Sequence, residues 1–290
     1  MSYLTRLKNR LRIDSVIKDD FIREIEGHLE DRIHELRDTG MTESEATETA
    51  THLLGSPQII AKEIYEIYSQ GSWKQTIFAV LPHFLTAALI AIHWWTNPFW
   101  LTLILLGVIG AVIYGWFHGK PTWLFSWMGF LLIPVIIAGV ILIYLPGDWA
   151  LVSTLVYVPL AVFILIVIAK QILVIDWLYL SLMLLPIPIV VAWLIVLSRG
   201  NVLIVSERIT ETALWISFSF AVIGLGVAIF IRVKQRWMKV AALLVCSVLI
   251  LTILTLVGAN SFNFLTGLFL CVLILLDLAL PAFLEHKVIK

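Results

Sequence analysis

Long apolar stretches recur along the chain from residue 73 onward. A helix needs roughly 20 apolar residues to cross a hydrocarbon core of about 30 Å, and eight stretches approach or exceed that length. Most are separated by short polar breaks such as "HGKP" and "GANS", which indicate antiparallel neighbours, because backbone in lipid must satisfy its own hydrogen bonds. The predicted spans are Thr76–Trp95, Pro98–Phe117, Thr122–Leu145, Ala150–Ala169, Trp177–Leu197, Leu214–Val233, Met238–Val257 and Phe262–Phe283.

The first 70 residues follow a different pattern, in which apolar positions recur three or four residues apart among charged ones. Leu4, Leu7 and Leu11 have this spacing, which predicts a first short amphipathic helix with basic residues around it. Such a helix could rest on anionic lipid or pack on the next helix. The second predicted helix presents Ile22, Ile25, Leu29, Ile33 and Leu36 on one face.

Capping residues delimit two further helices. Gly40 is suited to end the second helix, because glycine adopts the left-handed conformation of a C-cap easily. Thr42 and Glu45 form a capping-box pattern that starts a third helix, and Pro57 starts a fourth. Helices this short are marginal alone, so they should fold on each other as a small bundle. The third helix should present Ala46, Ala50 and Leu53, and the fourth Ile60, Ile64 and Ile67.

The composition divides the chain in the same way. It is 60% hydrophobic with 14% charged residues, and its mean hydropathy is +0.98. Residues 1–74 hold 10 Lys and Arg and 14 Asp and Glu, a net charge of −4, whereas residues 75–290 carry +4. We therefore predict an all-α protein with a small cytoplasmic helical bundle at 1–70 and an eight-helix polytopic transmembrane bundle at 71–290.

Basic residues between the spans predict the orientation. Cytoplasmic connections are enriched in Lys and Arg. If the N-terminus is cytoplasmic, the outside connections hold only Arg199 and Arg208, and both termini face the cytoplasm. The inside connections and tail then hold Lys120, Lys170, Arg232, Lys234, Arg236, Lys239, Lys287 and Lys290.

Two ionisable residues within the predicted spans are candidates for intramembrane chemistry. Asp277 lies deep in "LILLDLALP", and a carboxyl at that depth is a functional hypothesis by default. The interpretation that we prefer is structural: Asp277 hydrogen-bonds a neighbouring helix or lies near the inner interface ahead of Pro281. His83, beside Pro82, could mark a kink in the first span or make a packing or hydrogen-bond contact. Asp176 lies close to the predicted turn at Lys170, so we expect it at the membrane interface.

No residue set in the membrane part predicts an enzyme. Paired carboxylates, a metalloprotease HExxH motif, a phosphate-binding loop and a Ser/His/Asp set are all missing. Cys246 and Cys271 lie in apolar runs and are expected to be small core residues. The glycines in "GVIG" (107–110) and "GLG" (224–226) are expected to allow close helix packing. We expect no catalytic residue, no cofactor and no metal.

Charged residues on the second helix are candidates for partner binding. His28 pairs with Glu24, and His34 with Glu30 or Asp31, at helical spacing, but one helix supplies at most two metal ligands here. A solvated charged face explains them better. The segment is net acidic, so no direct nucleic-acid partner is expected. The candidate partner-binding face is Glu24, His28, Asp31 and Glu35.

The order of residues in the N-terminal part resembles a known family. The stretch "EIEGHLEDRIHELRDTGMTESEATETATHLLGSPQIIAKEI" (24–64) combines His-Leu at 28–29, Gly-Met-Thr at 40–42, Glu-Ala at 45–46 and Leu-Gly-Ser-Pro at 54–57. This pattern is similar to the HAAS domain and its close relative, the permease prefix domain. The resemblance covers about the first 65 residues, and several of its positions are helix-capping residues.

The resemblance implies regulation without catalysis. Such modules are joined to bacterial inner-membrane proteins, often encoded beside PadR-like transcription regulators, or they precede export permeases. The closely spaced spans and the lack of a large extracytoplasmic insertion depart from the permease-linked kind. The first hypothesis is a signalling or scaffold protein that contacts membrane lipid and binds a cytoplasmic protein. The alternative is a transporter or a membrane-anchoring subunit of a larger complex.

Overall fold

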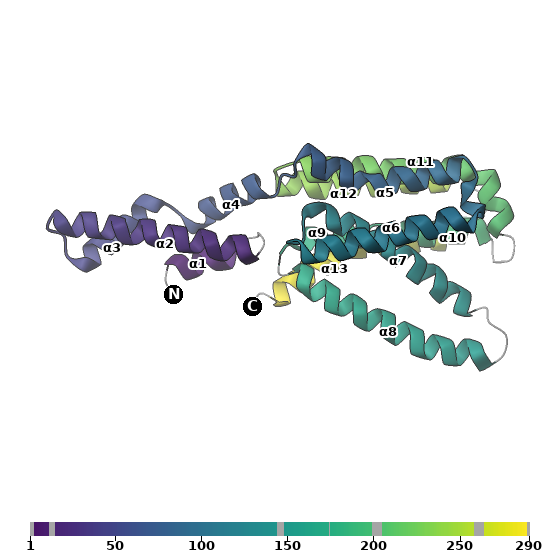
Figure 1. The fold of residues 1–290 in the computed structure, drawn as a ribbon, viewed down its shortest axis with the longest axis horizontal. Helices are drawn as coiled ribbons and strands as arrows, with labels where there is room; N and C mark the ends of the chain where they lie inside the picture. Colours follow the sequence, from purple (N-terminus) through teal and green to yellow (C-terminus); the bar gives the residue numbers. More distant parts are fainter. Residues whose placement is uncertain are drawn as a thin grey trace. The chain divides into compact units, whose positions relative to one another are not determined.

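Two compact units of helices make up the protein, Met1–Gln70 and Gly71–Lys290. Figure 1 shows both units in a computed structural model. The predicted all-α class, with a short helical part followed by long apolar helices, is confirmed over the described residues. The structure describes residues 3–11, 15–143, 148–173, 175–198, 205–257 and 264–288.

Four helices form the N-terminal unit, as the periodicity and caps predict. The capping box of Thr42 and Glu45 is present, and Gly40 and Gly55, which follow two of the helices, have positive φ angles of 96° and 89°. Ser56 caps the last helix, and Pro57 occupies its first turn. The helices are α1 (Tyr3–Arg10), α2 (Ser15–Asp38), α3 (Glu43–Leu54) and α4 (Pro57–Tyr68).

The buried side chains of this unit come mainly from its first and last helices. Leu7, Ala61 and Ile64 are buried together, with apolar residues of α2 packed against them. The prediction was wrong at two positions, because Leu53 is 59% exposed and Ile67 is 68% exposed. Each of these helices is only 12 residues long, and the small core does not extend to its last apolar residue.

The second unit contains the membrane-spanning helices. Seven segments of the described residues are long and apolar enough to cross a membrane, and Thr122–Val135 of α7 is a shorter apolar stretch. The elements are α5 (Trp73–Ala91), the 3₁₀ helix η1 (Trp94–Thr96), α6 (Pro98–Phe117), α7 (Thr122–Ile143), α8 (Asp148–Leu173), α9 (Trp177–Leu184), α10 (Pro186–Ser198), α11 (Val205–Arg232), α12 (Arg236–Val257) and α13 (Phe264–Val288).

Several helix boundaries differ from the apolar runs. α5 begins at Trp73, capped by Ser72, and ends at Ala91, where His93 takes a left-handed conformation and η1 follows. α11 begins at Val205, nine residues before the predicted Leu214. Its 28 residues are about 42 Å long, more than the ~30 Å hydrocarbon core. Polar residues continue the helix beyond the apolar stretch, so hydropathy alone places the start of α11 too late along the chain.

The fifth predicted span is two helices that form the centre of the unit. α9 ends at Leu184 and α10 begins at Pro186, because proline has no N–H to continue the helical ladder. In the span Trp177–Leu197, 72% of the residues of its most apolar window are buried, against 6% in Thr154–Leu173 of α8. Figure 1 shows α8 diverging from its neighbours. The fifth span is therefore surrounded by protein, and α8 is a peripheral helix.

The two glycine pairs have different surroundings. A Cβ built on Gly226 would lie 2.9 Å from Cys246 Sγ, so α11 and α12 approach closely there. Gly107 and Gly110 of α6 have open space where a Cβ would be, which contradicts the predicted close packing. Cys246 is buried as predicted, whereas Cys271 is exposed. Hydropathy predicts that a residue lies in a span, but it does not predict which side of the helix faces protein.

Candidate functional site

The candidate partner-binding residues form an exposed stripe along α2. Glu24, His28, Asp31 and Glu35 are all exposed, and their spacing of four, three and four residues places them on one side of the helix. Arg32 donates to Glu35 at 2.5 Å within the same helix. The stripe can therefore offer carboxylates and an imidazole to a protein surface.

Acidic residues dominate the segment that carries this stripe. Residues 15–54, which hold α2 and α3, contain 11 Asp and Glu against 4 Lys and Arg, a net charge of −7. α1 is basic, with Arg6, Lys8 and Arg10, and Lys8 pairs with Asp19 of α2 at 2.8 Å. The hydrogen bond from Lys8, together with its positive charge, lowers the pKa of Asp19. One cation of α1 is therefore directed to α2, and most of the acidic surface stays open to solvent.

The capping box fixes the turn between α2 and α3. The Thr42 hydroxyl donates to Glu45 Oε2 at 2.7 Å, and the Thr42 backbone N–H donates to the same oxygen at 3.1 Å. These two hydrogen bonds stabilise the charged carboxylate and lower the pKa of Glu45. The turn that joins the acidic helices is thus held by its own side chains.

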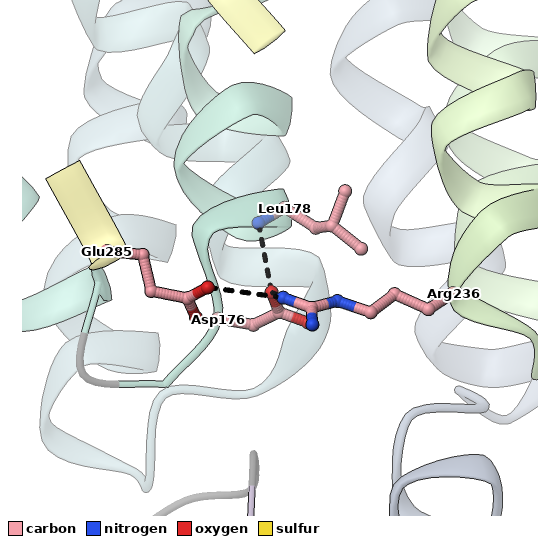
Figure 2. Close-up of polar contacts among 4 residues, drawn as sticks. All are labelled: Asp176, Leu178, Arg236 and Glu285. Atoms are coloured by element: carbon pink, nitrogen blue, oxygen red, sulfur yellow. Dashed lines mark hydrogen bonds and ion pairs between the residues drawn. The ribbon is translucent and has the colours of Figure 1, made fainter. Parts of the chain in front are cut away.

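The membrane unit contains a buried charge cluster that the sequence pattern did not reveal. Asp176 is fully buried, caps α9 by accepting from the Leu178 N–H at 3.2 Å, and pairs with Arg236 Nη2 at 2.8 Å. Glu285 of α13 lies 3.5 Å from the same nitrogen. Figure 2 shows the Arg236 side chain reaching these two carboxylates. The ion pair and the helix cap let Asp176 be buried among protein atoms at the start of α9.

Lys239 completes the charge cluster (Asp176, Arg236, Lys239 and Glu285). It follows Arg236 by three residues on α12 and is 1% exposed. Its Nζ lies 4.8 Å from the Phe230 ring centre, where a cation–π contact forms. Asp176 also acts electrostatically on Lys239. Two anions and two cations thus balance in formal charge and join three helices.

The residue types in this cluster follow from its helix ends. Asp176 is favourable at the N-terminus of α9, where the helix dipole attracts an anion. Arg236 is the first residue of α12, where the same dipole disfavours a cation. The two nearby carboxylates, rather than helix capping, explain why an arginine occupies this position. A cation at a helix start, with carboxylates elsewhere at span ends, is the sequence signal that could have indicated the pair.

His83 makes a buried polar contact between α5 and α7. Its Nε2 lies 2.9 Å from Ser126 Oγ, and the Ser126 hydroxyl donates to the Ala79 carbonyl at 2.8 Å. The hydroxyl proton is thus used, so His83 donates from Nε2. Its ring also meets Phe130 edge-on at 4.7 Å. This arrangement joins two helices and holds no second titratable group.

Asp277 is buried in α13 opposite α9. Its backbone carbonyl accepts from the Ser181 hydroxyl at 2.8 Å. The carboxyl oxygen Oδ1 has no hydrogen-bond partner among the described residues, and the residue is 8% exposed. His83 and Asp277 are not brought together by any contact found in the described part of the chain. Across the same ranges, no group of three His, Cys, Asp or Glu residues is placed to hold a metal ion.

Comparison with known proteins identifies the N-terminal unit. Residues 2–63 match the HAAS domain family. The match covers the four helices up to the middle of α4 and none of the membrane spans. No curated protein matches the chain. No solved structure matches it either. The protein therefore carries an N-terminal HAAS module joined to a set of apolar helices.

Proposed function

We propose that the protein is a non-catalytic membrane signalling or scaffold protein whose HAAS module binds another protein. The observation that carries this proposal is the exposed acidic stripe of α2 on a folded, capped module. Charged side chains that are neither buried nor needed for the core are free to face a partner. A partner for this surface would present basic residues, since complementary charge steers association.

We place the HAAS module in the bacterial cytoplasm, on a multi-pass protein of the inner membrane. The support is the bias of Lys and Arg toward the connections on the side of the N-terminus. An even number of spans would return the C-terminus to that side. The HAAS partner would then be a cytoplasmic protein, and a PadR-like regulator is our specific candidate because related modules are encoded beside such regulators.

A capture experiment with the whole chain tests the proposal. The full-length protein in nanodiscs, tagged at its C-terminus, is incubated with a purified PadR-like regulator from the same organism. Reversing the stripe charges with Glu24→Lys and Asp31→Lys should abolish capture, and added salt should weaken it. Glu63→Lys changes an exposed charge on α4 and is the matched control.

Two results would contradict the proposal. One is that neither the regulator nor any cytoplasmic protein is captured while the HAAS module stays folded, as judged by hydrogen exchange in α2 and α3. The other is that Glu63→Lys weakens capture as much as the stripe variants do, because the acidic stripe would then have no special role.

A second candidate function is transport, or anchoring within a membrane complex. It rests on the buried carboxyl oxygen of Asp277 that has no hydrogen-bond partner among the described residues. Intramembrane carboxyls of this kind often lie on ion or proton pathways. If the protein transports an ion, Asp277→Asn abolishes flux in proteoliposomes, whereas Ser181→Ala only weakens it. Absence of any flux, or equal flux in the Asn variant, removes this candidate.

A further inference from the structure

An apolar cavity of about 560 Å³ opens between α5, α6, α7, α10 and α11. Its walls are aliphatic and aromatic side chains, with Thr86 as the one hydroxyl residue. It forms because α6 packs on α7 and leaves space on the side of α5. The volume lies within the roughly 300–1,000 Å³ typical of small-molecule sites.

The cavity occupies one half of the membrane span. We call the end at which α5 ends and α6 begins the distal end. On α6 the lining starts at Leu101, three residues after the helix begins, and stops at Val108 near its middle. On α11 it runs from Ile209 to Phe220, a separation of 11 residues that corresponds to about 16 Å along the helix. That length is about half of a 30 Å hydrocarbon core, the depth of one leaflet.

Trp193 contributes its indole ring to this apolar lining. It lies on α10, five residues, or about 7 Å, from the distal helix end at Ser198. The side chain is 4% exposed, and its Nε1–H has no hydrogen-bond partner among the described residues. Buried indole N–H groups normally find an acceptor. In Trp193 the Nε1 atom is enclosed by protein atoms, so the side chain offers the cavity its apolar ring surface.

The size and chemistry of the cavity select its occupant. One turn of a helix about 10 Å wide fills about 420 Å³, so the cavity would admit little more than a single turn. Water is disfavoured because an apolar cavity offers it too few partners. We propose that the cavity binds one acyl chain of a membrane phospholipid, which packs against the apolar lining that includes the Trp193 ring. This proposal is independent of protein binding by the HAAS module.

Photo-crosslinking in nanodiscs tests the lipid site. Full-length protein is reconstituted with a phospholipid that carries a diazirine on its acyl chain, and labelled peptides are mapped. Peptides that line the cavity should be labelled severalfold more than α8, although Leu155 of α8 is 64% exposed and faces lipid without a cavity. Unlabelled phospholipid should compete for the cavity signal.

Filling variants make the test specific. Val190→Trp fills the cavity and should abolish the excess labelling, whereas Val156→Trp on the exposed side of α8 should not. Leu105→Trp, at a lining residue that is 37% exposed, replaces Val190→Trp if that variant fails to fold.

Two outcomes overturn the lipid site. One is labelling of the lining that only equals labelling of α8. The other is excess labelling that remains unchanged in the filled variant, which would place the lipid elsewhere and leave the cavity to a small apolar molecule or to another protein. Neither outcome affects capture of a cytoplasmic partner, so this proposal and the proposed function fail separately.

Discussion

At the scale of single residues, the buried ion pair is the feature with the clearest energetic consequence. The Asp176 side chain is fully buried, whereas the Arg236 side chain is 40% exposed. Without the ion pair, water could still solvate the arginine but not the carboxylate. Removing one partner of a buried pair leaves an uncompensated charge, which costs more than losing an exposed pair. Glu285, 3.5 Å from the same nitrogen, would lose its contact as well.

Arg236→Gln should therefore destabilise the membrane unit. We expect a loss of about 1–3 kcal/mol, below the value for a fully buried pair because Arg236 is partly exposed to solvent. Thermal unfolding in one fixed detergent measures it, with Lys234→Gln, an exposed lysine two residues earlier, as the control. In a double-mutant cycle, Asp176→Asn should cost less in the Arg236→Gln background. Additive losses would show that the two residues are not coupled.

At the scale of elements, the cap of α3 shows how a local motif responds to pH. The folded-state pKa of Glu45 is lowered by its hydrogen bonds from Thr42. A lowered pKa means that the cap stabilises α3 above the pKa of the unfolded carboxyl. That stabilisation is lost as the pH falls through the folded-state pKa.

Hydrogen exchange of the full-length protein checks this dependence. Protection of the α3 amides, corrected for intrinsic rates, should fall in acid. At neutral pH, Thr42→Ala should lower the free energy of opening of α3, as measured by this protection, by about 1 kcal/mol. Glu45→Gln should remove the share of this acid-dependent loss of protection that arises at the α3 cap. An unchanged acid response in Glu45→Gln would assign the effect to other carboxylates, such as Asp19, whose pKa is lowered by Lys8.

Helix packing gives a second prediction at this scale, from two glycines in similar sequence contexts. Gly226→Val should destabilise the protein by about 1–3 kcal/mol, because its Cβ would lie 2.9 Å from Cys246 Sγ. Gly107→Val has open space at the same position and should change stability by about 0.5 kcal/mol or less. Unfolding midpoints of the two variants in the same detergent make the comparison. Equal losses would contradict the assignment of Gly226 to a helix contact.

At the scale of the whole molecule, the membrane unit has two unlike halves. One end carries the charge cluster that joins α9, α12 and α13, and the distal half contains the apolar cavity. Ion pairs at the helix ends hold the first end together, while the distal half leaves space between α5 and α6. We expect changes in lipid composition to affect helix packing in the distal half. We expect charge substitutions to affect helix packing at the other end.

Cysteine labelling tests the proposed orientation of the whole chain. In a background of Cys246→Ala and Cys271→Ser, Thr39→Cys in the HAAS module and Thr96→Cys in η1 each give one exposed thiol. An impermeant maleimide should label Thr96→Cys in intact cells and Thr39→Cys only after the membrane is opened. The reverse pattern would place the HAAS module outside the cytoplasm and remove the proposed partner.

The amino-acid sequence by itself determined the features that depend on local pattern. Apolar runs long enough for a bilayer predicted the spans, since partition into lipid depends on composition along a stretch. The pair Thr42 and Glu45 predicted the start of one helix and Pro57 the start of another, because such signals act over about three residues. Where polar residues extend a helix beyond its apolar run, as in α11, the apolar pattern placed the start of the helix too late along the chain.

Only the tertiary structure decided which distant residues meet. Arg236 is 60 residues from Asp176 and 49 from Glu285, so no local spacing could pair them. In an apolar span every side is hydrophobic, and sequence alone cannot distinguish a lipid-facing glycine such as Gly107 from a packed one such as Gly226. The cavity beside Trp193 likewise exists only because five helices enclose it.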